Sequence, residues 1–372
     1  MRCRILVVAG LAACMTGLVA RPVRSGTPQL GEIMKRAQQV RELTITEADE
    51  IKIGAGVSEK VRVRYGVVQN AAIHRYVSLV GGVLVAHSKR PGLPWKFVVL
   101  DTDGVNAFAA PGGYIHITRG ALALMGSEAE LADVLAHEIV HVTGKHTVKA
   151  IQKSKAAQMG AQETLQNAQV FSRIVDATTE MVLAGFGRGE ELASDEEGIR
   201  LASAVGYNPA GLSAFLTRLT ERNKSATEKQ GLFASHPEMK ERLDKLAAQV
   251  RREKLGGAAT LEDRYAKNVT YKPKAQTEIA AVAPGSAGLA GGSKKPAEEE
   301  KKEDAPKKKG FGIGSLLKPT GSEKKSAEVT GSGASRGVDT ERGAKGGAVP
   351  TLVAVTITQT DLDEFRRQGH LE

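Results

Sequence analysis

The chain has 372 residues, of which 41% are hydrophobic and 25% charged. This balance is typical of a soluble globular protein, so it excludes wholesale disorder and a membrane protein with many spans. The formal net charge is +10, but residues 27–250 contribute only +1 of it, with 26 Lys and Arg against 25 Asp and Glu. The central region therefore offers no basic surface for nucleic acid, and we expect no nucleic acid partner.

The first 26 residues predict an export signal. A basic start precedes an apolar run over residues 5–20, which is too short to span a membrane comfortably. Leu11-Ala12-Ala13-Cys14 has the form of a bacterial lipobox, in which Cys14 would carry the lipid, whereas Leu18-Val19-Ala20 fits ordinary cleavage. An uncleaved anchor is the third alternative. We expect an exported protein of the periplasm or cell envelope, either soluble or attached to the membrane by lipid.

Residues 27–255 predict one mainly helical domain with a small sheet. Apolar side chains recur at helical spacing over residues 29–53 and 67–86. From Trp95 the pattern becomes that of strands, and Pro111-Gly112-Gly113 predicts a tight turn before the last strand. We expect a three-stranded antiparallel sheet with strands at residues 95–100, 106–109 and 114–118.

Ser127-Glu128-Ala129-Glu130 is a capping box, and apolar residues recur on one helical face behind it. A helix is therefore expected from Ser127 past His141. Residues 151–183 favour helix but contain few large apolar side chains, and a glycine-rich break follows, which predicts a mobile helical flap and a hinge. Further helices are expected at residues 190–204, 210–222 and 237–252.

The end of the chain divides into two segments. Residues 256–348 predict a low-complexity linker, because Ala, Gly, Ser, Pro and blocks of charge cannot bury enough apolar surface to offset the entropy of ordering. Residues 349–372 predict a short strand followed by a helix, which would form a docking tail.

His137-Glu138-Ile139-Val140-His141 lies within the capped helix. Residues four apart share a helix face, so both imidazoles can reach one metal ion while Glu138 lies beside its open position. A chance match to this pattern is expected in on the order of one per cent of chains. The alternative is a solvated helix with incidental histidines, but the apolar residues around the motif favour a helix packed on a core.

A hydrolytic zinc site needs a third protein ligand and an open position for water. Glu191 and Asp195 lie four apart at the start of a later helix. We expect Glu191 to bind the metal and Asp195 to hold the other nitrogen of a ligating histidine. An acidic first helical turn is the alternative explanation. His146 is expected at the surface or an interface, and His116 in the packing of the sheet.

Several further motifs accompany the His-Glu-Ile-Val-His core in a fixed order. They are Asn106-Ala107-Phe108, Pro111-Gly112-Gly113-Tyr114-Ile115, Arg119-Gly120-Ala121-Leu122, Arg188-x-x-Glu191-x-x-x-Asp195-x-x-Gly198, Gly206-Tyr207-Asn208-Pro209, and Ser235-His236-Pro237 with Arg242. With this set, residues 30–250 resemble metallopeptidase family forty-eight, the gluzincin zinc peptidases, and are most similar to its periplasmic BepA- and LoiP-like members.

The resemblance implies an α+β, mainly helical zincin-type domain with a small antiparallel sheet. It also implies one zinc ion per chain, with His137, His141 and Glu191 as ligands, Glu138 as general base and Asp195 as support for a ligand. His236 matches a histidine near the metal that can modulate it or steady the oxyanion. The resemblance further implies that an edge strand holds the substrate. Its residues here are Asn106, Ala107, Phe108 and Ala109.

The expected function is that of a zinc endopeptidase that hydrolyses polypeptides outside the bacterial cytoplasm, in quality control of misfolded envelope or outer-membrane proteins. The alternative is a latent peptidase that acts mainly as a periplasmic chaperone or binding module for outer-membrane proteins, with the flap and His236 blocking the site. A third alternative is that the lysine-rich tail adheres to anionic lipid or the cell wall.

Overall fold

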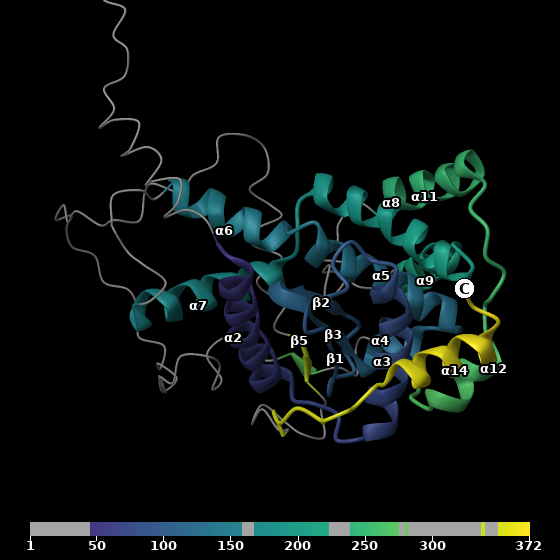
Figure 1. Ribbon diagram of the computed structural model, residues 1–372, viewed down its shortest axis with the longest axis horizontal. Coiled ribbons are helices and arrows are strands. Elements are labelled where there is room, and N and C mark those ends of the chain that lie inside the picture. The colour runs from purple at the N-terminus through teal and green to yellow at the C-terminus, as the bar shows by residue number, and fades with distance from the viewer. Residues whose placement is uncertain (1–44, 158–166, 223–238, 275–279, 282–335, 339–348) are drawn as a thin grey trace, which may run out of the picture. The chain divides into compact units, whose positions relative to one another are not determined.

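The structure is a computed structural model (Figure 1) and describes residues 45–157, 167–222, 239–274, 280–281, 336–338 and 349–372. The predicted export signal with Cys14, and also His236, lie outside these residues. Among the helices that the structure describes, none is both long enough and apolar enough to cross a membrane.

The sheet has three strands in the order β1-β3-β2, where β1 is Lys96–Leu100, β2 is Ala107–Ala110 and β3 is Tyr114–Thr118. The 3-10 turn Pro111–Gly113 joins β2 to β3 as an antiparallel pair. Gly112 has a φ of 70° there, which a residue without a Cβ adopts readily.

One expectation about the sheet is wrong, because β1 pairs with β3 in parallel and the sheet is mixed. Both connections between strands are short, so the strands alternate in direction along the chain and β1 and β3 point the same way. Since β3 rather than β2 lies in the centre, its pairing with β1 is parallel. The three strands and their positions agree with the prediction, as does the mainly helical α+β fold.

Alternate side chains of each strand enter two different cores. In β1, Phe97 and Val99 face the larger core, whereas Val98 and Leu100 face the smaller one. Figure 1 shows helices on both sides of the sheet. The smaller core involves α2 (Glu47–Tyr65), α6 (His146–Ala157) and α7 (Ala168–Ala184). The larger core involves α3 (Ala71–Ala86), α4 (Arg119–Leu124), α5 (Glu128–Thr143), α8 (Arg188–Val205), α9 (Gly211–Arg222), α11 (Met239–Glu253) and α12 (Glu262–Asn268).

Helix α5 is buried on every side, since each residue from Glu128 to Val142 is buried. Ser127 is its N-cap and accepts from the backbone N–H of Glu130. The Glu130 carboxylate accepts from the N–H of Gly126 rather than that of Ser127, so the second half of the predicted capping box is displaced by one residue. A helix enclosed in this way holds its side chains rigidly.

Two differences from the predicted organisation follow from packing. Helix α2 begins at Glu47 behind an N-cap at Thr46 and runs to Tyr65, well past the predicted end at residue 53. The packed region also extends beyond residue 255, where the linker was expected to begin, because Tyr265 of α12 and Val269 lie in the larger core. Beyond residue 274, the described residues include the short antiparallel pair β4 (Ala280–Ala281) and β5 (Arg336–Val338).

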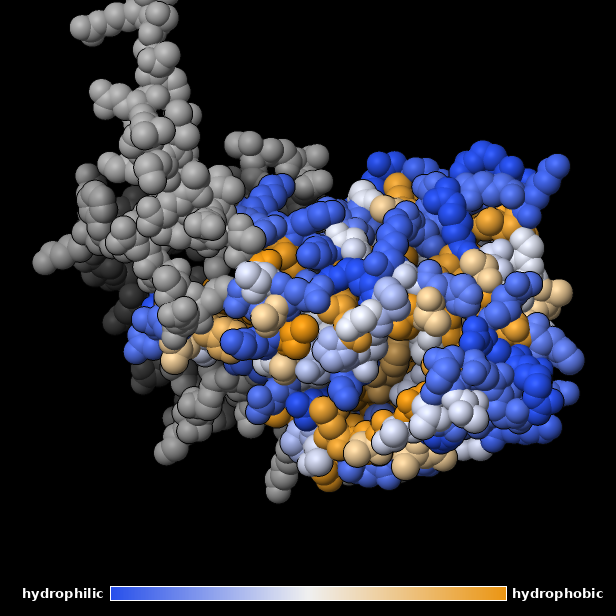
Figure 2. All heavy atoms as spheres, viewed as in Figure 1, coloured by the Kyte–Doolittle hydropathy of each residue, from blue (hydrophilic) through white to orange (hydrophobic). Residues whose placement is uncertain are grey.

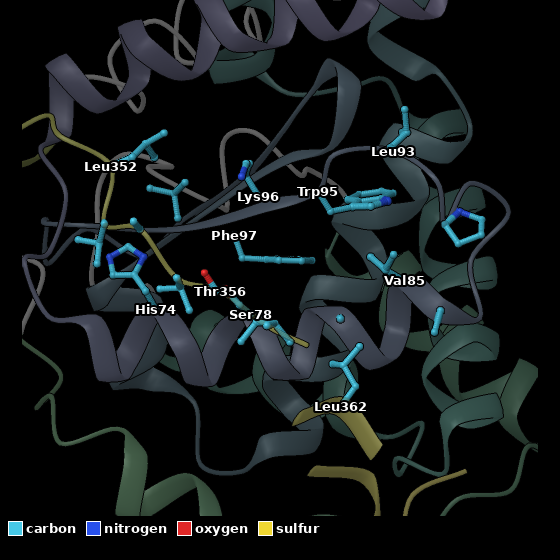
Figure 3. Close-up of a pocket in the computed structure, with 18 of the residues that line it drawn as sticks. His74, Ser78, Val85, Leu93, Trp95, Lys96, Phe97, Leu352, Thr356 and Leu362 are labelled. Atoms are coloured by element: carbon cyan, nitrogen blue, oxygen red, sulfur yellow. The ribbon is translucent and has the colours of Figure 1, made fainter. Parts of the chain in front are cut away.

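The C-terminal segment, residues 349–372, docks as predicted but forms no strand ladder among the described residues. Its first part is extended, with a hydrogen bond from the N–H of Val67 to the carbonyl of Val349. Helix α14 (Gln359–Gly369) then lies on α3, with Phe365 in the larger core. A cavity of about 930 Å³ remains between α3, β1 and residues 352–357 (Figure 3).

Polar side chains cover most of the face shown in Figure 2, including helices α8, α11 and α14. Large apolar side chains are exposed at three described positions, Val63, Val349 and Leu352. Two of these belong to the C-terminal segment beside the cavity.

Candidate active site

Two histidines of α5 and a glutamate of α8 meet inside the larger core. The Nε2 atoms of His137 and His141 lie 3.0 Å apart. Oε2 of Glu191 lies 3.5 Å from Nε2 of His137, and its Oε1 lies 3.4 Å from Nε2 of His141. All three side chains are buried, and their ligand atoms lie within 4.8 Å of one another. The structure therefore brings the three predicted metal ligands together.

This spacing fits a single zinc ion. Bonds of about 2.0–2.1 Å at a tetrahedral angle place two ligand atoms about 3.3 Å apart. The observed separations of 3.0 to 3.5 Å lie on both sides of that value. Two imidazoles and one carboxylate also leave a fourth position open, which is the donor set of catalytic rather than structural zinc sites.

Asp195 lies behind His137, with its Oδ1 2.9 Å from Nδ1 of the histidine. Burial lowers the pKa of His137, but hydrogen bonds with Asp195 and Glu191 outweigh burial and raise this pKa to about 9. Burial also acts to raise the pKa of Asp195, but the charge of Arg242 and the hydrogen bonds with His137 and Arg242 together outweigh burial and lower this pKa. Asp195 thus contacts the nitrogen of His137 that does not face the site, as expected of a residue that orients a metal-binding histidine.

Arg242 of α11 completes this cluster. Its Nε and Nη2 donate to Asp195 at 2.7 and 2.6 Å, and its Nη1 lies 3.3 Å from Oε2 of Glu191. Arg242 belongs to one of the motifs in the sequence, but no role was predicted for it. The position of Arg242 on α11 could have indicated this role. Arg242 shares the buried face of the helix with Met239, Leu246 and Gln249, and a cation on a buried face needs an anionic partner.

His146 is half-buried at the other side of the pair, and its contact with His141 was not predicted. Its Nδ1 is 3.0 Å from Nδ1 of His141. Phe186 stacks on the His141 ring, with centroids 4.2 Å apart and planes inclined by 18°. Phe186 belongs to the break between α7 and α8 that was predicted as a hinge. His116 lies in the packing of the sheet, as expected, and its Nε2 contacts the hydroxyl of Ser58.

Helix α8 approaches α5 closely because Gly198 has no side chain. A Cβ at this position would lie 3.0 Å from the backbone nitrogen of His137 and 3.1 Å from its Cα. These distances are tighter than ordinary contacts, and the atoms belong to the backbone of a buried helix. Gly198 therefore sets the separation across which Glu191 and Asp195 reach the histidines.

The predicted substrate strand lies at an edge of the sheet but is not exposed. Ala107, Phe108 and Ala109 belong to β2 and are at most 3% exposed, and Asn106 immediately before them is also buried. Helix α7 packs against β2. Glu138 is likewise buried, and none of these residues lines the cavity of Figure 3. The predicted substrate strand and Glu138 are thus buried in this structure.

The helix with two histidines and a glutamate, joined by a second glutamate from a later helix, defines a zincin-type metallopeptidase domain. Comparison with known proteins then gives the family, since residues 69–250 match peptidase family M48. This part of the chain is thus similar to M48 peptidase domains, as its motifs indicated.

Relatives of known name come from two groups. The beta-barrel assembly-enhancing protease of Escherichia coli K12 is 25% identical over 249 residues, which are 64% of this chain and 50% of that protein. The mitochondrial metalloendopeptidase OMA1 of Schizosaccharomyces pombe is 27% identical over 187 residues, 48% of this chain and 55% of that protein. The chain thus spans about half the length of these relatives.

Proposed function

We propose that the protein is a zinc-dependent endopeptidase that hydrolyses internal peptide bonds of polypeptides. The observation that carries this proposal is the convergence of His137, His141 and Glu191, at separations that fit one zinc ion. The M48 domain and the two groups of peptidase relatives support the same class of reaction.

Zinc held by these three residues supplies Lewis acidity to water and to the peptide carbonyl. Glu138 follows His137 on the rigid helix α5, beside the ligands, and its carboxylate takes a proton from the attacking water and later delivers it to the leaving amine. Asp195 and Arg242 hold His137 in the tautomer that presents Nε2. We also propose that His236 steadies the oxyanion and that β2 holds the substrate as an added strand.

The test is cleavage of an unfolded polypeptide such as casein, with new termini mapped by mass spectrometry. Wild type should cut internal bonds, and Glu138→Gln should retain about one zinc per chain while losing at least about a thousandfold in rate, because it lacks the proton acceptor. Full cleavage by Glu138→Gln would contradict the proposed role of this residue. Cleavage by His137→Ala at the wild-type rate would contradict the proposed site.

We further propose that the protein acts in the cell envelope on misfolded envelope or outer-membrane proteins. Support comes from the signal-like sequence of residues 1–26 and from relatives whose name refers to beta-barrel assembly. Intact-mass analysis of the protein isolated from its host should show loss of the leader. A start at Cys14 with added acyl mass would indicate a lipoprotein, a start after Ala20 a soluble protein, and an unprocessed chain would contradict cleavage.

A second candidate is a latent peptidase that mainly binds unfolded outer-membrane proteins. The burial of β2 under α7 and the stacking of Phe186 on His141 favour its latency, because both cover parts of the site that a substrate has to reach before cleavage. Binding of an unfolded outer-membrane protein by both wild type and Glu138→Gln, with release of intact chain by wild type, would favour this candidate over the peptidase.

A further inference from the structure

We propose that His146 is a positioning residue for the metal site, where it accepts a hydrogen bond from His141 and thereby fixes the tautomer of this ligand. The proposal rests on the proposed function, since it concerns the ligand of the same site. It assigns a role to a histidine that the HExxH motif does not include.

The geometry defines which atoms take part. Nε2 of His141 faces Nε2 of His137 and the Glu191 carboxylate, so a metal ion there requires the Nε2 lone pair of His141 and leaves its proton on Nδ1. Nδ1 of His146 lies 3.0 Å from that Nδ1. Of two nitrogens at this distance one donates and the other accepts. His141 therefore donates, and His146 accepts with its own proton on Nε2.

The orientation of the rings agrees with this bond. The planes of His141 and His146 are inclined by 83° with centroids 5.0 Å apart, so the rings meet edge-on rather than stacked. Phe186 covers the face of the His141 ring at the same time. His137 has a corresponding partner at its Nδ1 in Asp195. Each imidazole ligand thus has an acceptor at the nitrogen that does not face the site.

The turn between α5 and α6 places the His146 ring. Lys145 has a φ of 56°, a left-handed conformation between the end of α5 at Thr143 and the start of α6 at His146. At Gly144 an added Cβ would lie 2.6 Å from Nε2 of His146 and 3.0 Å from its Cδ2. Glycine at this position therefore leaves the space through which the ring reaches back to His141.

The test compares His146→Asn with His146→Leu in the full chain. The two replacements have nearly the same shape, but the Asn Oδ1 lies where Nδ1 of histidine lies and can accept, whereas the Leu methyl groups cannot. Zinc affinity, measured by competition with a chelator, should fall about 10- to 100-fold in His146→Leu and stay within about threefold in His146→Asn. Gly144→Ala should lower it as well, because its Cβ displaces the ring.

Thermal unfolding of the metal-free variants separates this role from simple packing. We expect the metal-free forms of His146→Asn and His146→Leu to unfold at similar temperatures, with His87→Leu as the control for loss of a remote, exposed histidine. Equal zinc affinities for His146→Leu and wild type, or equal losses in His146→Leu and His146→Asn, would overturn the proposal. A wild-type protein that binds no zinc would instead overturn the proposed function.

Discussion

Arg242 explains how two carboxylates can be buried side by side next to the histidines. It binds Asp195 through two hydrogen bonds and lies 3.3 Å from Glu191. A buried ion pair contributes little net stability, but loss of one partner leaves an uncompensated charge. At the scale of single residues, the site therefore depends on a cation that pairs with the two carboxylates beside the histidines.

His116 predicts a pH dependence of stability. Burial, followed by the nearby charge of Arg62, lowers its pKa from 6.5 to about 3. As pH falls below 6.5 the unfolded chain binds a proton that the folded chain does not, so stability is full above this pH and is lost toward pH 3. From pH 7 to pH 5 this loss reaches about 2 kcal/mol.

Denaturant unfolding of wild type and His116→Gln at both pH values measures this effect. The difference in unfolding free energy between the two proteins should shrink as the pH falls, because only wild type carries the titrating group. Parallel pH profiles would show that His116 is not held neutral by the fold.

At the scale of elements, the separation of α5 and α8 predicts the effect of a single methyl group. Gly198→Ala places a Cβ about 3 Å from the backbone of His137, so α8 must shift and carry Glu191 and Asp195 away from the histidines. Zinc affinity should fall about tenfold or more. Gly189→Ala is the matched control on the same helix, since no atom lies within 4 Å of its added Cβ. Equal zinc affinities of the two variants would show that the close approach of α5 and α8 does not determine zinc binding.

The elements also show what the sequence could predict. Periodicity and capping located α3, α5, α8 and α9 within a few residues, because each has a continuous buried face or a clear start. The four-residue spacing of His137 and His141, and that of Glu191 and Asp195, predicted which side chains share a helix face, and the family resemblance singled out Glu191 as the third candidate ligand.

Other features of the fold and site depend on contacts between distant segments, which local sequence patterns cannot predict. The parallel pairing of β1 with β3 follows from which strand occupies the centre. The contact of His146 with His141 depends on the left-handed turn at Lys145, and that of Arg242 with Asp195 on the packing of α11 on α8. Tyr265 enters the core from a stretch whose composition resembles a linker.

At the scale of the whole molecule, the C-terminal segment is joined to α5, the helix that bears His137 and His141. Arg264 of α12 donates to the carbonyl of Phe365 and lies over its ring, with 4.0 Å to the centroid. The same guanidinium pairs with the buried Glu128 at the start of α5, which also accepts from the hydroxyls of Tyr76 and Tyr207.

Phe365→Ala should therefore destabilise the whole domain, by about 3 kcal/mol for loss of a buried aromatic side chain. Gln368→Ala, at an exposed position of α14, is the control and should change stability little. Denaturant unfolding gives both values. An unchanged midpoint for Phe365→Ala would mean that the C-terminal segment unfolds independently of the domain.

The proposed function requires one zinc ion held by two residues of α5 and one of α8. X-ray diffraction from crystals of the protein, recorded at the zinc absorption edge, locates this ion. We expect one anomalous peak per chain, within bonding distance of Nε2 of His137, Nε2 of His141 and the Glu191 carboxylate. A zinc-loaded crystal with no peak at these atoms, or with its zinc bound elsewhere, would contradict it.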